Sequence, residues 1–253
     1  MNTPAKSLLV AFAVWGVHLN SQAAPQSLQQ FVSEHPNVEN SHKVIACAAG
    51  GKEVSMGDEK FPISVYFYPV PGATNFHYFE SSSANINAKD FSKYRLATVE
   101  LAPVFNGYLR RFKHGPVNNE VWGVVTYQVN DQLVLSNPIR MKLTTKPTQM
   151  ANELVNIEAG VTEPKFDWQD GVVKENAIYF QVVSDAAGNL ISGTYTEQKH
   201  FQFYNLSNVV VNIHDVRPPP TLQTNATYTF TLMGVSEDNW VNLMVQKPFA
   251  TGK

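Results

Sequence analysis

Residue types that commonly carry catalysis or bind metals are few in this sequence, and their spacing predicts no such site. Seven histidines are present, and none stands in the H-x-H, H-x₃-H or H-E-x-x-H spacing that holds zinc. Cys47 is the only cysteine, so no thiolate cluster can form. Nucleophile-elbow, Walker and dinucleotide-binding sequences are absent. We therefore expect no catalytic residues, no cofactor and no metal ligands; an enzyme with residues dispersed over distant strands is a third alternative.

Two aspartates, Asp167 and Asp170, offer hard oxygen ligands of the kind that calcium binds. Two carboxylates are too few for a calcium site by themselves. The alternative is a turn, in which Asp170 and Gly171 reverse the chain and Asp167 faces solvent.

The one local basic cluster runs from Arg110 to His114 and includes Arg111 and Lys113. Guanidinium groups match planar oxyanions, so the cluster is a candidate site for an acidic glycan or a phosphate. Charged residues also protect exposed sheet edges, and a solvated strand end is the competing interpretation.

Aromatic residues crowd the segment 66–79 around the turn at Pro71 and Gly72. Successive side chains of a strand point to opposite faces, so we assign Val65 and Phe67 to the core. Tyr66, Tyr68 and Tyr78 are then expected to face outward, where they form a candidate ligand surface together with Arg110, Arg111 and Lys113. Aromatic rings that stack on sugars, including Trp122 and Trp240, are the basis of a second hypothesis, carbohydrate binding.

The composition indicates a packed globular protein. Of the 253 residues, 43% are hydrophobic and 16% are charged, below the ~25% charged residues of typical soluble proteins. Lys and Arg number 19 against 21 Asp and Glu, a net charge of −2. With this near-neutral net charge, the chain has no overall positive electrostatic potential that would attract nucleic acid, so we expect no nucleic-acid partner.

The first 23 residues resemble an export signal. Lys6 precedes the apolar run 7–19, and small residues at Ser21 and Ala23 suit signal peptidase. The run is shorter than the ~20 residues that a membrane-spanning helix needs, and no later segment reaches that length. The chain is thus expected to be secreted, periplasmic or at the cell surface. The segment 44–47 loosely resembles a lipoprotein acylation site, but a polar segment precedes it where such a signal needs an apolar one. Cys47 is therefore expected to be a buried thiol in a strand.

Hydrophobic patterning predicts one short helix at 26–34, followed only by strands. The first set of strands is expected at 44–48, 63–68, 76–79, 96–101, 108–112, 121–128, 133–135 and 139–143. The second set is expected at 165–168, 177–183, 190–196, 201–204, 209–214, 227–233 and 240–246. A polar segment at 144–149 separates the sets, so the predicted organisation is a signal peptide (1–23), an N-terminal segment (24–42) and two β-sandwich domains (43–149 and 150–253).

The second set resembles a fibronectin type III domain. Trp168 in the segment Phe166-Asp167-Trp168 is similar to the tryptophan of that family's second strand, and Leu222 with Tyr228 is similar to its tyrosine corner. In the first set, Phe67 stands where the family has Trp and Phe76 where it has Tyr. Leu101 with Tyr108 offers a second corner, with Tyr127 as a rival.

The resemblance implies an all-β protein of two tandem fibronectin type III-like sandwiches. This fold serves adhesion modules, receptor ectodomains and carbohydrate-associated accessories alike, so the fold does not name the function. The leading hypothesis is an exported, non-enzymatic binding or structural protein that contacts a protein or a surface glycan. The alternative is a carbohydrate-binding or glycan-processing accessory.

We predict that export removes the first 23 residues, because signal peptidase reads the small residues at Ser21 and Ala23. Intact-mass measurement of protein from the exported fraction should give a chain that begins at Ala24. An Ala23→Lys variant should keep its full length. A mature protein that still begins at Met1 would contradict the assignment.

Overall fold

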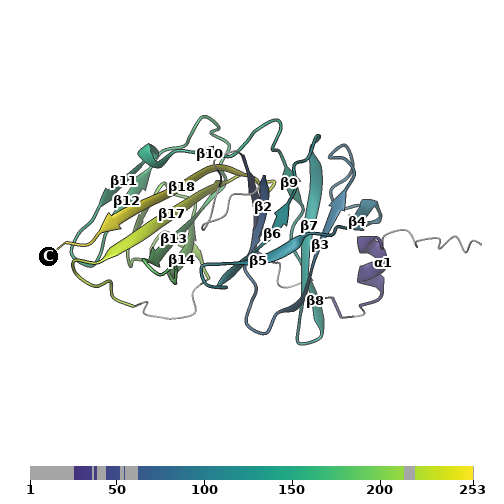
Figure 1. Cartoon of the computed structure of the whole chain (residues 1–253), viewed down its shortest axis with the longest axis horizontal. Coiled ribbons are helices and arrows are strands. Elements are labelled where there is room, and N and C mark those ends of the chain that lie inside the picture. Colours follow the sequence, from purple (N-terminus) through teal and green to yellow (C-terminus); the bar gives the residue numbers. More distant parts are fainter. Residues whose placement is uncertain are drawn as a thin grey trace, which may run out of the picture.

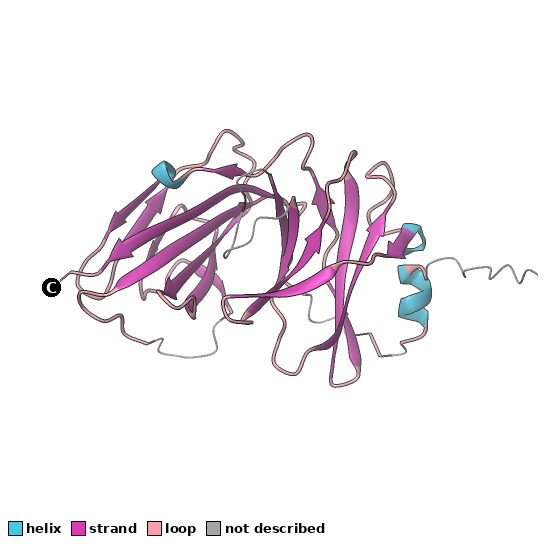
Figure 2. Cartoon of the chain, in the orientation of Figure 1, coloured by secondary structure: helices cyan, strands magenta, loops and turns pink. Residues whose placement is uncertain are grey.

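The computed structural model describes residues 26–35, 37–38, 44–51, 54, 62–213 and 220–252. The predicted signal peptide and part of the predicted N-terminal segment lie outside these residues. The described chain folds into four largely antiparallel sheets and one short α-helix; the sheets form two units that lie one after the other along the long axis of the molecule, with the helix at one end (Figures 1 and 2). The all-β expectation of two tandem fibronectin type III-like sandwiches is confirmed. No helix in the described part of the chain has the length and apolarity to cross a membrane.

The first sandwich consists of two sheets around one apolar core. One sheet has the order β1-β2-β6-β5, and the other has the order β4-β3-β7-β8, with β9 also paired to β7. The strands are β1 (Ala46–Gly50), β2 (Ile63–Phe67), β3 (Thr74–Ser81), β4 (Tyr94–Leu96), β5 (Glu100–Val104), β6 (Leu109–His114), β7 (Val121–Val129), β8 (Gln132–Leu135) and β9 (Ile139–Met141). A short 3-10 helix, η1 (Phe91–Lys93), precedes β4.

The second sandwich pairs a small sheet with a large one. The small sheet has the order β11-β12-β15, and the large sheet has the order β10-β18-β17-β13-β14-β16. The strands are β10 (Gln149–Met150), β11 (Val155–Glu158), β12 (Lys165–Trp168), β13 (Ile178–Asp185), β14 (Leu190–Thr196), β15 (His200–Gln202), β16 (Val209–Asn212), β17 (Thr227–Val235) and β18 (Val241–Ala250). A second 3-10 helix, η2 (Asn152–Leu154), follows β10.

The tyrosine corner predicted in the second sandwich is present. The hydroxyl of Tyr228 accepts a hydrogen bond of 2.9 Å from the main-chain N–H of Gln223, next to the buried Leu222. Trp168 packs edge-on against Tyr179 in the core between the two sheets. Of the two alternatives for a corner in the first sandwich, Leu101 with Tyr108 is wrong, because the hydroxyl of Tyr108 donates to the carbonyl of Ile213 in the second sandwich, at 3.2 Å.

The predicted helix is α1 (Leu28–Ser33). It packs on the sheet β4-β3-β7-β8, which is the outer sheet of the first sandwich. A capping box at its start satisfies two N–H groups: Ser27 accepts from the N–H of Gln30, and Gln30 accepts from the N–H of Ser27. Leu28 and Phe31 then pack on Phe79 and Val124 of the sheet, and the helix lies against this side of the molecule in Figure 1. The part of the sheet that lies under α1 is therefore buried on both faces.

The two sandwiches share an apolar interface. Tyr66 and Leu109, on the outer face of sheet β1-β2-β6-β5, belong to the same buried cluster as Phe180, Met233 and other residues of the large sheet. Apolar area in such a contact stabilises by about 25 cal/mol per Å². The interface thus fixes one sandwich against the other.

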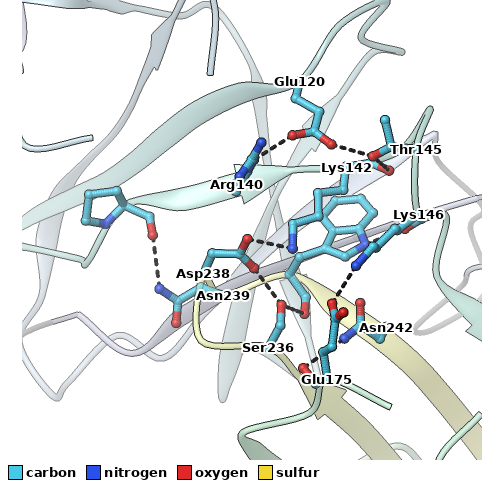
Figure 3. A network of polar contacts seen from close by, with 12 residues as sticks. Glu120, Arg140, Lys142, Thr145, Lys146, Glu175, Ser236, Asp238, Asn239 and Asn242 are labelled. Carbon is cyan, nitrogen blue, oxygen red and sulfur yellow. Dashed lines mark hydrogen bonds and ion pairs between the residues drawn. The ribbon is translucent and has the colours of Figure 1, made fainter. Parts of the chain in front are cut away.

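Trp240 anchors this interface from the turn between β17 and β18. Its indole is 0% exposed and packs in the core of the first sandwich, although its strand neighbours belong to the second. The indole N–H donates to the carbonyl of Lys146 at 2.7 Å, and Asn239 donates to the carbonyl of Pro138 at 3.0 Å. Lys146 and Asn239 are labelled in Figure 3.

Two ion pairs drawn in Figure 3 lie close to this turn. Lys142 contacts Asp238 at 2.5 Å, and Lys146 contacts Glu175 at the same distance. Each pair joins the first sandwich, or the segment that leaves it, to the second. They give the apolar anchor a polar rim.

Most predicted strands are confirmed to within four residues at each end, and 165–168 and 190–196 have their predicted bounds. The strand expected at 96–101 is wrong. The structure has two strands there, β4 and β5, which lie in different sheets. Because the two strands are only three and five residues long, their sequence was interpreted as one continuous strand, and the crossover between the sheets was not predicted.

We predict that Trp240→Ala lowers the free energy of unfolding by about 3–5 kcal/mol, because a large buried ring leaves a cavity. Urea denaturation should detect the change. Trp122→Ala is the matched control: this indole is only half-buried, so its loss should cost clearly less. Equal costs for the two variants would show that Trp240 is no anchor.

Candidate functional site

A cleft of about 730 Å³ opens between the two sandwiches. One wall is strand β5 with the turn that follows it, and the opposite wall is the loop between β13 and β14. Strands β17 and β18 contribute Thr229, Thr231 and Gln246. A cleft of this volume lies within the range of sites that bind small ligands or short chain segments.

The cleft exists because one face of the large sheet changes character along its length. Alternate residues of β17 share this face: Met233 and Val235 at one end, Thr229 and Thr231 toward the other. The apolar end is buried against the first sandwich, whereas the threonine end is left beside open space. The switch from apolar to hydroxyl side chains therefore decides where the interface ends and the cleft begins.

Buried polar side chains lie at the base of the cleft. Arg111 is 4% exposed, and its guanidinium donates to the Ser64 hydroxyl at 3.4 Å. Thr231 is 1% exposed, and its hydroxyl has no hydrogen-bond partner in the described structure. A buried hydroxyl without a partner is costly, so Thr231 would gain from a hydrogen bond to a ligand.

The loop wall is held by its own hydrogen bonds. Asp185 accepts from the N–H groups of Ala187 and Asn189, at 2.9 and 2.8 Å. Partial burial opposes ionisation of Asp185, but the hydrogen bonds from Asn189 and Ala187 outweigh it and lower the pKa of the carboxyl. The amide of Asn106 donates to Asn189 at 2.6 Å and bridges the two walls at one end. The walls are therefore positioned without a ligand.

The basic run at 110–114 does not form one cluster. Arg111 and Lys113 face the cleft, where Lys113 pairs with Glu100 at 2.8 Å. Arg110 lies over the ring of Phe76, 4.9 Å from its centre, and His114 contacts Glu80 at 2.7 Å. Strand alternation sends neighbouring residues of β6 to opposite faces, so only two of the predicted basic site residues share a surface.

The expectation that Tyr66 and Tyr78 face outward is wrong. Tyr66 is 1% exposed in the interface between the sandwiches, and Tyr78 is 0% exposed in the core of the first sandwich. Burial raises the pKa of both hydroxyls. Tyr68 is half-buried and stacks on Tyr108 at 5.9 Å between ring centres. The three tyrosines thus present no common ligand surface.

Asp167 and Asp170 do not converge. Asp167 is exposed, whereas Asp170 is buried and accepts hydrogen bonds from Tyr179 at 2.5 Å and Asn176 at 2.8 Å. Lys199 contacts its other oxygen at 2.5 Å. Burial opposes ionisation of Asp170, but these partners outweigh it and lower the pKa of the carboxyl. Asp170, which follows β12, thus links the start of β13 and the segment before β15 through these contacts.

The remaining candidates lie apart from the cleft. Trp122 donates its indole N–H to the carbonyl of Ala84 at 3.1 Å, and Arg140 lies 5.7 Å from its ring centre. Cys47 is paired into β1, and burial raises the pKa of its thiol to about 12. Within the described ranges, no three His, Cys, Asp or Glu side chains gather as a metal site.

Sequence reasoning missed the polar side chains of the cleft, namely Ser184, Thr229, Thr231 and Gln246. A signal was present in the segment Thr227-Tyr228-Thr229-Phe230-Thr231, where three threonines alternate with aromatic residues. Alternation predicts one hydroxyl face, but it does not reveal that a second sandwich leaves that face beside a cleft.

No family model matches the sequence, and no curated protein matches it. Two solved structures of fibronectin type III domains are similar in fold. A two-domain segment of chicken tenascin has a TM-score of 0.31 and 8% identity, covering 75% of this chain and 91% of that one. The FN1-FN3 domains of chicken CNTN1 have a TM-score of 0.30 and 12% identity, covering 76% of this chain and 62% of that one. Similarity of this extent does not indicate what the chain binds.

We predict that His114 makes stability depend on pH. Burial disfavours the imidazolium, but the hydrogen bond and charge of Glu80 outweigh this, and the pKa of His114 is raised. The contribution is therefore fully present below the unfolded pKa of about 6.5 and is lost as the pH rises through the folded pKa. His114→Gln should remove this part of the difference in unfolding free energy between about pH 5.5 and pH 8.

Urea denaturation at the two pH values measures the effect. His200→Gln, at an exposed histidine, is the matched control and should keep the wild-type pH dependence. A His114→Gln profile identical to that of wild type would contradict the assignment.

Proposed function

We propose that this chain is an exported, non-enzymatic binding protein that acts in the periplasm, at the cell surface or in the medium and holds a protein partner in the cleft between its sandwiches. In this proposal the two sandwiches correspond to residues 43–149 and 150–253. Export depends on the apolar run at 7–19, which lies outside the described residues.

The single observation that carries this proposal is the fixed cleft. The buried cluster that contains Tyr66, Phe180 and Met233 holds the sandwiches together, and the Asn106 bridge holds the walls. Walls that are ordered before binding save the entropy that a partner would otherwise have to overcome. Polar groups at the base of the cleft then provide specificity, because a mismatched partner leaves them unpaired.

The carbohydrate hypothesis loses the aromatic residues on which it depended. Tyr66, Tyr78 and Trp240 are buried, and the half-buried Trp122 is engaged by Ala84 and Arg140. Among the described residues that line the cleft, Phe105 is the only aromatic one. Protein binding is therefore the better supported of the two functions.

Site-specific photo-crosslinking tests the proposal in cells that export the protein. A benzophenone amino acid at Ala187, exposed on the cleft wall, should give discrete adducts of higher mass. The same residue at Val172, which is 84% exposed and does not line the cleft, is the matched control and should not give them. Identical adduct patterns, or no adduct from Ala187, would refute the cleft as the binding region.

A further inference from the structure

We infer that the cleft accepts an extended peptide, which pairs through its main chain with the open edge of strand β5. This inference rests on the proposed binding function and names the chemical class of the partner. It is carried by three features of the described residues: the position of β5 in its sheet, the composition of the opposite wall and the state of Thr231.

Strand β5 is the last strand of its sheet. It pairs with β6 on one side, from Glu100 opposite Lys113 to Val104 opposite Leu109, and its other side borders the cleft. Edge strands of the neighbouring sheet are partly covered: Ser27 bridges to Arg95 in β4, and Val38 bridges to Leu133 in β8. An uncovered edge offers main-chain donors and acceptors to an added strand.

Pro103 determines which groups the edge presents. A proline is tolerated in a strand where its nitrogen faces away from the paired neighbour, so the nitrogen of Pro103 is expected on the open side. Main-chain groups alternate, and Leu101, two residues earlier, is then expected to direct its N–H and carbonyl to the same side. The edge therefore offers one complete donor and acceptor pair at Leu101 and a carbonyl at Pro103, a limited pattern that suits a short segment.

The wall formed by β17 and β18 supplies neutral hydrogen-bonding groups at the level of this edge. Thr229 and Thr231 present hydroxyls, and Gln246, paired with Thr231 across the two strands, presents an amide. Such groups match the amides of a peptide. A sugar would instead favour exposed aromatic faces, which this wall does not contain among the described residues that line it.

Substitution of Thr231 distinguishes a role in peptide binding from a role in folding, because the two roles predict different effects on the melting temperature and on peptide affinity. Because the hydroxyl is buried and without a partner in the described structure, Thr231→Val should leave the melting temperature unchanged or raise it. The same substitution should weaken peptide binding about threefold to tenfold, the effect of one lost hydrogen bond. A residue that served folding alone would show the opposite sign for stability.

The experiment presents the full exported chain to an array of linear peptides with blocked ends and to a glycan array. We expect peptides to bind. Methylating alternate main-chain nitrogens of a bound peptide should abolish binding in one of the two alternating sets only, because the two edges of a strand differ. Ala186→Trp, which fills the mouth of the cleft from an exposed position, should reduce binding at least tenfold. Val172→Trp is the matched control and should not.

The other outcomes separate this inference from the proposed function. Binding of glycans in place of peptides would overturn the peptide inference and leave a binding protein. If Thr231→Val and Ala186→Trp both leave peptide affinity unchanged, the peptide binds outside the cleft, and the peptide inference is overturned as well. No binding on either array, together with cleft-specific protein adducts from Ala187, would exclude a linear segment while the proposed function stands. No binding and no adducts would overturn both.

Discussion

The contact between Trp240 and the core of the first sandwich is the interaction on which the arrangement of this molecule depends. The ring comes from a turn of the second sandwich, yet it is fully buried among residues of the first. Its N–H is satisfied by the carbonyl of Lys146, so burial leaves no polar group unpaired. With this turn fixed, the large sheet of the second sandwich meets the first along its apolar end, and the cleft forms at its polar end.

Burial of sheets on both faces explains why so many aromatic residues are internal. In an isolated sandwich each sheet has one face in the core and one in water. Here α1 covers the outer sheet of the first sandwich, and the second sandwich covers its other sheet. Tyr78 and Phe79 are therefore both buried although they are neighbours on β3, and the outward side of Tyr66 is an interface.

How much the sequence could predict follows from this arrangement. Strand alternation and turns predicted most of the strands, apolar spacing predicted the helix, and Tyr228 identified the corner, whereas the short strands β10 and β11 were not predicted. These features depend on local pattern. The split between β4 and β5, the burial of Tyr66 and Tyr78, and the cleft depend on which sheets cover one another. Alternation assigns a residue to a face, but only the tertiary structure decides whether that face meets water, a helix or another sheet.

The position of α1 has a consequence for the order in which the chain can become compact. Leu28 and Phe31 are synthesised early, yet their partners Val124 and Leu133 follow only after nearly the whole first sandwich has been made. A helix of six residues is too short to be stable alone, so it must wait for that sheet. The segment that carries α1 therefore becomes ordered only after strands far along the chain have formed their sheet, so docking of this helix is a late step of folding.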